Sequence, residues 1–433
     1  MISQKIIQKA LEIAQDAQVT ILTRETSAVD FENDRLKSAE SSQRTQINLK
    51  VIVDGKIGVS STTDPKDVRG VVDRALESAQ FGSKAHYKIP EPQELRDVDV
   101  FDPALEHLEK PEMIRIGQQM MDMIKAYNPD ILAGATINKI LSTVEYANSK
   151  GATYTADHTD FNIGTEGQLV RDTDILFAGR SLGQKNREVD TEELASRAIE
   201  YFQQSENTAP IQSGEMPVII MPEGFVLLLY SLYLAADGKN VMLGASPLRD
   251  KLGQQIADQR LTIIDDPFIK YGPASSAFDD EGTARQVTPI IEKGILKNFV
   301  YDLDTAGRSG AEPTGHGNDR NWTNIMIEPG EVSVENMIKG MDEGLLVKDY
   351  LGLGQGNPIN GEFSVNVFLG YKIENGEIVG RVKDVMLAGN AFSALMNISA
   401  ISKEREWVSG PYNYVNGLFP YIQIDQLSVT TKG

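Results

Sequence analysis

Three dipeptides that end in glycine and separate apolar runs constrain the fold more than any other feature: Asp54-Gly55, Lys293-Gly294 and Asn375-Gly376. A tight type I′ turn requires positive φ at both central residues, a requirement that Asn, Asp and Gly meet most easily. Around the first pair, apolar and polar residues alternate, which is typical of strands with one buried face. The pattern predicts hairpins of adjacent antiparallel strands in both halves of the chain.

Apolar residues at helical spacing lie between these hairpins. Asp64-Pro65 offers an N-cap followed by a first-turn proline, and it predicts a helix that begins there. The apolar stripe of this helix is Val68, Val71, Val72, Ala75 and Leu76. Lys110-Pro111 opens a second helix, whose methionines we interpret as core filler. Residues 190–193 resemble a capping box ahead of a third helix.

The best candidate for a domain boundary is the segment 205–217, which carries two prolines, a glycine and polar neighbours. We therefore predict an N-terminal domain over residues 1–208 and a C-terminal domain over residues 209–433. Residues 218–220 are expected to begin the second domain as a short buried strand. Helices and mostly antiparallel strands in both halves predict an α+β protein of two domains.

The net charge of the chain is −20, because 62 acidic residues face 42 basic ones. Such a field repels phosphate backbones and anionic lipid surfaces, so direct binding to nucleic acid or a membrane is disfavoured. The chain has no cysteine, which excludes disulfides and thiolate metal sites. Its N-terminus has the pattern of an amphipathic helix, and its longest apolar run is far shorter than a bilayer span. We expect a soluble cytoplasmic protein.

That longest apolar run, 225–236, lies in a predicted helix over residues 222–238. The helix is apolar on all sides, so it should be buried. A catalytic zinc needs about three ligands from His, Cys, Asp or Glu. The run instead offers only apolar groups, two phenols and the hydroxyl of Ser231. A nucleophilic role for Ser231 would require a nearby base, and no motif supplies one.

Two glycine motifs invite functional interpretations. Gly179 to Gly183 matches the Gly-x-Ser-x-Gly pattern of hydrolase elbows, but that chemistry needs a strand leading directly into a helix. The residues after Gly183 are polar, so we interpret the match as coincidence. Gly352 to Gly356 resembles a phosphate loop, yet the following Asn-Pro segment is a poor helix start. We expect a loop that lets another backbone approach closely.

The histidines and the acidic triplet carry weaker signals. No two of His86, His107, His158 and His316 lie within one helical turn of each other. We expect His158 in a polar turn or at a strand end. For His316, contact with a bound peptide and hydrogen bonding that fixes its own loop remain equally open. Carboxylates adjacent in sequence alternate in direction on a strand, so residues 279–281 predict a turn rather than a cation site.

Five blocks follow one another in the second half of the chain: Leu252-Gly-Gln-Gln255, Phe278-Asp-Asp-Glu-Gly-Thr283, Glu292-Lys-Gly-Ile-Leu296, Pro313-Thr-Gly-His-Gly317 and Leu387-Ala-Gly-Asn390. Together they resemble the TldD/PmbA family, also called the modulator of DNA gyrase family or peptidase family U62. In the TldD branch, a helix upstream of the first block bears a His-Glu-x-x-x-His zinc motif, and a cysteine lies near the C-terminus. The corresponding helix here has no such motif, and the cysteine is absent. The resemblance therefore points to the PmbA, or TldE, branch.

This resemblance implies a non-catalytic subunit of a zinc metalloprotease that processes or degrades unfolded or leader-bearing peptides. No catalytic residue and no cofactor are expected in this chain, because zinc is expected only in a TldD-type partner. The residues expected where that partner holds metal are Tyr230, Ser231, Tyr233 and Leu234. Those expected near the peptide cleft are Gly315, His316, Gly317, Gly354 and Gly356. The peptide would bind by strand addition. The alternative is a homodimeric peptide-binding or regulatory protein without protease activity.

Overall fold

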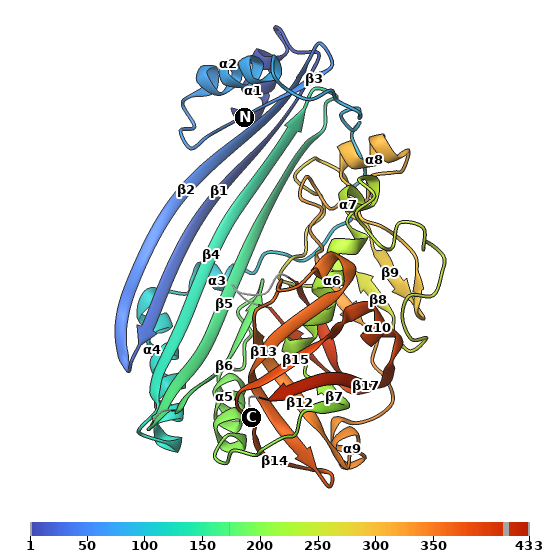
Figure 1. Ribbon diagram of the computed structural model, residues 1–433. Coiled ribbons are helices and arrows are strands. Elements are labelled where there is room, and N and C mark those ends of the chain that lie inside the picture. Colours follow the sequence, from blue (N-terminus) through green and yellow to red (C-terminus); the bar gives the residue numbers. More distant parts are fainter. Residues whose placement is uncertain (1, 173, 410–414, 432–433) are drawn as a thin grey trace.

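The computed structural model describes residues 2–172, 174–409 and 415–431. Within these residues the chain forms a six-stranded N-terminal sheet and an eleven-stranded C-terminal sheet, with helices packed against both (Figure 1). Most strand pairs are antiparallel, which confirms the predicted α+β architecture. The domain limits at residues 208 and 209 remain a prediction.

The N-terminal sheet has the strand order β3-β2-β1-β4-β5-β6. Its strands are β1 (Asp16–Glu32), β2 (Arg35–Val53), β3 (Lys56–Thr62), β4 (Leu132–Asn148), β5 (Thr153–Arg171) and β6 (Asp174–Gln184). Four of them are 17 to 19 residues long. Figure 1 shows these long strands curving around one side of the C-terminal part. Strand β6 forms the edge of the sheet on that side.

Helices bury one face of this sheet at each end. Helices α1 (Ile2–Ala10) and α2 (Val68–Ala79) enclose a core with β1 and β2. Helices α4 (Lys110–Tyr127) and α5 (Thr191–Gln204) cover the other end, and α3 (Pro103–Glu106) precedes α4. The methionines of α4 at 113, 120 and 121 are buried, which confirms their interpretation as core residues. Of the capping box predicted for α5, the N-cap half is confirmed, because the side chain of Asp190 accepts from the backbone N–H of Glu193.

The predicted start of α2 was wrong by one turn. Its N-cap is Asp67, whose side chain accepts from the backbone N–H of Gly70. Asp64 instead accepts from the N–H of Lys66 at 2.9 Å, and so forms a separate turn just before the helix. The predicted apolar stripe is confirmed, since Val71, Val72 and Ala75 are buried and its other two members pack against them.

The three predicted glycine turns are all present. Asp54 and Gly55 have φ of 48° and 72°, Lys293 and Gly294 have 48° and 79°, and Asn375 and Gly376 have 52° and 79°. Each pair joins two antiparallel strands. The turn chemistry of these dipeptides therefore fixes three hairpins.

The C-terminal sheet surrounds the largest apolar core of the molecule. Its strands are β7 (Gly214–Ile220), β8 (Ile263–Asp265), β9 (Thr288–Glu292), β10 (Ile295–Leu296), β11 (Asn324–Ile327), β12 (Glu343–Leu351), β13 (Glu362–Glu374), β14 (Glu377–Arg381), β15 (Val385–Asn390), β16 (Ile398–Val408) and β17 (Asn416–Thr431). Residues 218–220 of β7 are buried as predicted. Strand β7 lies between β12, which runs parallel to it, and β17, which is antiparallel.

The remaining helices are short and lie mostly around this core. They are η1 (Glu223–Phe225), α6 (Val226–Ala236), α7 (Gly238–Met242), α8 (Leu303–Ser309), α9 (Val334–Lys339), η2 (Pro358–Asn360) and α10 (Ala391–Met396). Helix α6 is in contact with α10, α7 and η2. None of the helices in the described part of the chain combines the length and the apolar character needed to cross a bilayer.

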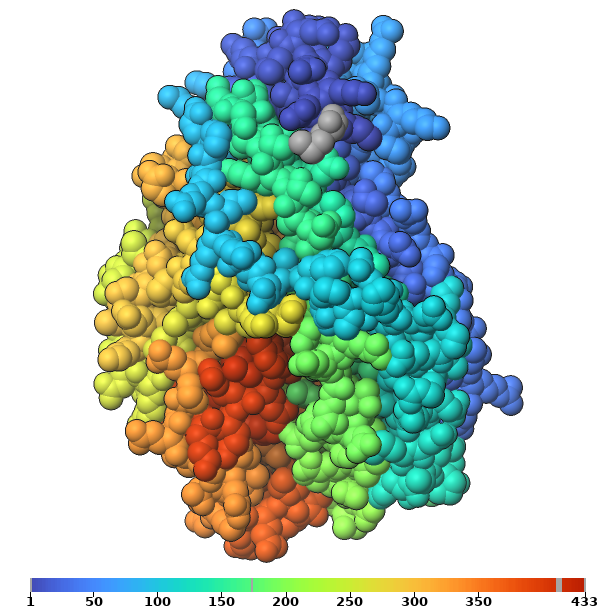
Figure 2. Space-filling model, turned by 180° about the vertical axis from the view of Figure 1, so that it is seen from behind, coloured from blue at the N-terminus to red at the C-terminus, as the bar shows by residue number. Residues whose placement is uncertain are grey.

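An irregular segment, residues 80–102, ties the two sheets together. It runs down the back of the molecule between the N-terminal sheet and the C-terminal part (Figure 2). Its Val100 carbonyl accepts from the N–H of Thr159 in β5, and its Asp99 carbonyl accepts from the N–H of Tyr271. The two sheets are therefore joined by shared hydrogen bonds as well as by chain connections.

The acidic triplet 279–281 lies at the same junction and forms a turn, as predicted. Asp279 accepts from the N–H groups of Glu281, Thr283 and Gly317, whereas Asp280 accepts from the N–H of Asn318. Glu281 lies 3.0 Å from the ammonium of Lys50 in β2 and accepts from the N–H of Leu303. The three carboxylates point to different partners, so each one stabilises a different part of the junction.

Candidate functional site

Helix α6 occupies the position where the resemblance places the metal-bearing helix. Its residues are apolar except for Tyr230, Ser231 and Tyr233, and most of its side chains are buried. The hydroxyl of Tyr233 donates a 2.8 Å hydrogen bond to the side-chain oxygen of Asn321, and its ring packs edge-on against Trp322. The expectation of an apolar, buried helix is confirmed.

The donor set of α6 does not fit a catalytic zinc. Zinc in proteins is held by His, Cys, Asp or Glu, and neutral phenol and hydroxyl groups are not among its usual ligands. Tyr233 already uses its hydroxyl on Asn321, and Leu234 offers no donor atom. Across the described ranges, no three His, Cys, Asp or Glu side chains are grouped as ligands of one ion. We therefore assign no catalytic step to a metal on this helix.

The loop around His316 is fixed by side-chain hydrogen bonds. His316 is buried, with its Nε2 atom 2.5 Å from Asp265 Oδ2 and its Nδ1 atom 2.9 Å from the hydroxyl of Thr314. Asp265 also accepts from the N–H of Thr323 at 2.8 Å. This geometry supports the loop-fixing role over direct peptide contact. Peptide contact by the flanking glycines, 315 and 317, stays a prediction.

The loop with Gly352, Gly354 and Gly356 precedes η2, and η2 contacts α6. All three glycines have positive φ, between 91° and 100°. The loop leads into a single 3₁₀ turn, so the phosphate-loop alternative is excluded. A close backbone approach occurs only at Gly356, where an added Cβ would lie 3.1 Å from the carbonyl oxygen of Glu362. For the other two glycines the backbone conformation is the constraint.

The prediction for His158 was wrong. This residue lies inside the 19-residue strand β5, five residues after its start, and is buried. Burial, together with the positive charge of Lys185, lowers the pKa of His158 to about 4. The polar sequence around it suggested a turn, but the segment 80–102 covers this part of the strand through the bond from Thr159 to Val100.

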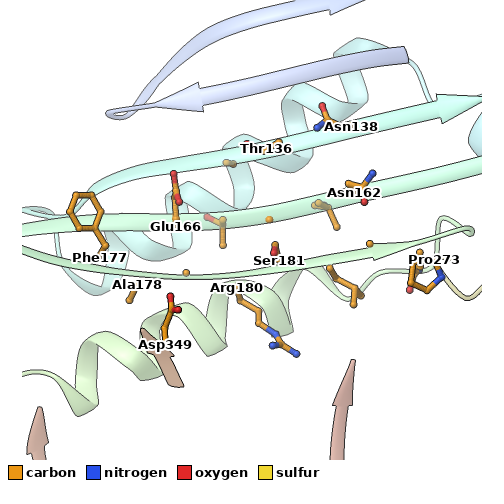
Figure 3. Close-up of a pocket in the computed structure, with 18 of the residues that line it drawn as sticks. Thr136, Asn138, Asn162, Glu166, Phe177, Ala178, Arg180, Ser181, Pro273 and Asp349 are labelled. Carbon is orange, nitrogen blue, oxygen red and sulfur yellow. The ribbon is translucent and has the colours of Figure 1, made fainter. Parts of the chain in front are cut away.

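A groove of about 710 Å³, which was not predicted from the sequence, lies where β6 meets the C-terminal part. Its walls come from β4, β5 and β6 on one side and from β12 and β13 on the other. Figure 3 shows Thr136 and Asn138 on one strand, Asn162 and Glu166 on the next, and Phe177, Arg180 and Ser181 on β6, with Asp349 facing them. None of the predicted cleft residues lines this groove.

The Gly-x-Ser-x-Gly match lies in this groove, but as a straight strand. All of residues 179–183 belong to β6, so Ser181 is not on a strand-to-helix elbow. Gly179 lies opposite Glu166 in the ladder, and a Cβ at Gly179 would come within 2.7 Å of Glu166 Cβ. A Cβ at Gly183 would meet the side-chain oxygen of Asn162 at 2.5 Å. The glycines of the motif are therefore explained by close packing between β5 and β6. They are the sequence signal that could have pointed to this strand.

The outer edge of β6 carries backbone groups without partners. Gly183 donates its N–H to the hydroxyl of Ser409, and this hydroxyl donates to the carbonyl oxygen of Gly183. Gly183 therefore directs both backbone groups away from β5. In a regular antiparallel ladder every second residue does the same, so residues 177, 179 and 181 also face outwards. Within the described ranges, these three residues have no backbone hydrogen bond on that side.

A charged network connects β6 to the start of α6. Arg180 forms ion pairs with Glu223 in η1 and, at 3.2 Å, with Glu406 in β16. Lys348 lies 3.8 Å from Glu223 and over the ring of Tyr201. Burial would raise the pKa of Glu223, but Lys348 and Arg180 outweigh it and lower this pKa to about 2. The edge strand and the buried helix are thus held in one fixed arrangement.

Comparisons with known proteins agree with this geometry. The fold matches the crystal structure of TldE from Thermococcus kodakarensis with a TM-score of 0.92, covering 99% of this chain and 100% of that one at 22% identity. In Buchnera aphidicola, a metalloprotease PmbA homologue is 25% identical over 355 residues, 78% of this chain and 77% of that protein. A metalloprotease TldD homologue of the same organism is 30% identical over 208 residues, 46% of this chain and 43% of that protein.

Two family models also match. The model for the PmbA/TldA metallopeptidase C-terminal domain covers residues 213–431, which is half of the chain, and the model for domain 1 of the same family covers residues 17–79. The C-terminal match begins at β7 and includes α6 and all strands of the C-terminal sheet. The chain belongs to the PmbA/TldA metallopeptidase family.

Proposed function

We propose that this chain is the metal-free subunit of a two-subunit zinc peptidase. In this proposal a TldD-type partner supplies the zinc, and the chain described here completes the chamber around that site and helps to hold an extended peptide. The observation that carries the proposal is the chemistry of α6, whose polar groups do not fit zinc. This chain belongs to a metallopeptidase family, but its α6 offers no zinc ligands. In this proposal, the zinc that performs the hydrolysis therefore lies on another polypeptide.

Two further observations support a pairing. Relatives named for the PmbA and the TldD branch occur together in one bacterium. The charged network of Arg180 and Glu223 also keeps α6 aligned with the free edge of β6. A rigid arrangement of this kind suits a subunit that positions a peptide for a partner rather than cutting it.

Strand addition at β6 is the proposed way of holding the peptide. The outward N–H and C=O groups of residues 177, 179 and 181 line the groove and can pair with the backbone of an extended chain. Backbone pairing depends little on the side chains of the ligand, so it suits unfolded or leader-bearing peptides of varied sequence.

Coexpression with a TldD-type protein tests the pairing. We expect one heterodimer by native mass spectrometry, with zinc bound to the partner and cleavage of an unfolded peptide that requires both chains. A chain that forms only homodimers in the presence of such a protein, and adds nothing to its activity, would refute the two-subunit proposal. That outcome would favour the homodimeric peptide-binding alternative.

Ser181→Pro tests the binding edge. Proline removes the outward N–H, and edge strands tolerate this change because that N–H is not part of the ladder. We expect peptide affinity to fall roughly tenfold, as one backbone hydrogen bond is lost and the ring blocks close pairing. Ile175→Pro is the matched control, since residue 175 faces outwards on the same strand but lies outside the groove. Equal effects of the two changes would argue against this edge.

A further inference from the structure

Some of the charged side chains that line the groove form ion pairs, and others do not. Its two cations, Arg180 and Lys348, are engaged with Glu223 behind the groove, and Arg180 is also paired with Glu406. Among its carboxylates, Asp160 pairs with Lys185. The other three, Asp30, Glu166 and Asp349, form no ion pair with any described residue. The groove therefore presents net negative charge to whatever enters it.

Two of these carboxylates lie close to β6, one on the neighbouring strand β5 and one across the groove. Glu166 is opposite Gly179 in the ladder and is exposed, with only a glycine between its side chain and the edge. Asp349 is exposed on β12 across the groove, and in Figure 3 it lies below Ala178. A strand that pairs with residues 177, 179 and 181 would pass between these two carboxylates.

The groove also has an apolar part beside its carboxylates. The rings of Phe177 on β6 and Phe368 on β13 stack with centroids 6.3 Å apart, so they bridge the two walls of the groove. Phe177 is 43% exposed despite its size. A lysine or arginine side chain matches this combination, because its methylene stem can pack on an aromatic ring while its charged tip reaches a carboxylate.

From this arrangement we propose that the groove selects extended peptides that carry a lysine or arginine side chain at the position paired with β6. The specificity-determining residues are Glu166 and Asp349, with Phe177 supporting the aliphatic stem. This inference rests on the proposed function, because it presupposes that β6 pairs with a peptide. It adds a substrate class to that function.

The test uses the full-length chain and three fluorescein-labelled nonapeptides that differ only at the central residue, which is lysine, norleucine or glutamate. Fluorescence anisotropy at low and physiological salt gives each affinity. We expect the lysine peptide to bind roughly threefold to tenfold more tightly than the norleucine peptide, with the glutamate peptide weakest. Raising the salt concentration should shrink this preference, because the attraction is between accessible charges.

Glu166→Gln and Asp349→Asn remove one charge each and keep the side-chain shape. We expect each single variant to remove about half of the free energy of the preference for lysine over norleucine, so that a tenfold preference falls to roughly threefold, and the double variant to abolish the preference. Glu331→Gln, an exposed carboxylate outside the groove, should leave the preference intact.

The outcomes separate the two proposals. If none of the peptides binds, the proposed function fails and the inference fails with it. If all three bind equally, or if the double variant keeps the preference for lysine, the inference alone is overturned and peptide binding stands.

Discussion

The ring of Tyr146 lies against Gly282, so that a Cβ atom added to Gly282 would come within 2.2 Å of Tyr146 Cε1. The hydroxyl of the same tyrosine donates a 2.9 Å hydrogen bond to the carbonyl oxygen of Glu281. Tyr146 belongs to β4, and Gly282 follows the acidic triplet of the C-terminal part. The two halves of the molecule are therefore in direct contact at a position where only glycine fits.

Gly282→Ala should reduce the free energy of unfolding by about 3 kcal/mol or more, because it adds a steric clash to the cost of positive φ. Gly253→Ala is the matched control: Gly253 has φ of 76°, close to the 77° of Gly282, but an added Cβ meets nothing within 4 Å. We expect the control to cost about 1 kcal/mol. Equal losses in urea unfolding would show that the Tyr146 contact does not constrain this position.

Arg180 and Ser181 are neighbours in the Gly-x-Ser-x-Gly segment, but we expect their substitution by alanine to change the stability of the chain by different amounts. Arg180→Ala leaves the half-buried Glu223 with Lys348 as its remaining ionic partner and should cost about 1–3 kcal/mol of stability. Ser181→Ala, at an exposed strand position, should change stability by less than about 0.5 kcal/mol.

A serine-directed phosphonate should not label the wild-type chain. Labelling that disappears in Ser181→Ala would restore the nucleophile interpretation.

Because His158 is buried, we expect the folded chain to lose stability as the pH falls. Its pKa is about 4 in the folded chain, below the ordinary histidine value of about 6.5, so the unfolded chain binds more protons between these two values. The stabilisation is complete above pH 6.5 and is lost as the pH falls towards 4, by up to about 3 kcal/mol.

His158→Gln should therefore flatten the pH dependence of unfolding in this window. His86→Gln, which replaces an exposed histidine, is the control and should leave the dependence as it is. An unchanged slope in His158→Gln would mean that the buried imidazole is not the group that titrates.

Features set by neighbouring residues could be predicted from the sequence. The Asp-Gly, Lys-Gly and Asn-Gly turns depend only on local backbone preferences, and the burial of α6 follows from its apolar character on every side. The start of α2 could not be settled in this way. Asp64 and Asp67 are both good caps, and the choice between them depends on packing against the sheet.

The groove could not be predicted, because its walls come from segments that lie far apart in the sequence. Glu166 and Gly179 become neighbours only through the register of β5 and β6, and Asp349 joins them from a different sheet. His158 was misplaced for a related reason. In the sequence, the four polar residues 157–160 resemble a turn. The structure shows that β5 continues through them and that the segment 80–102 covers this part of the strand.

The central claim is that this chain has no zinc site of its own, and metal analysis of the purified full-length protein tests it most directly. Inductively coupled plasma mass spectrometry, combined with a peptide cleavage assay with and without chelator, gives both quantities on one sample. The account predicts far less than one zinc per chain and no chelator-sensitive cleavage. Near-stoichiometric zinc together with cleavage that a chelator abolishes would contradict it.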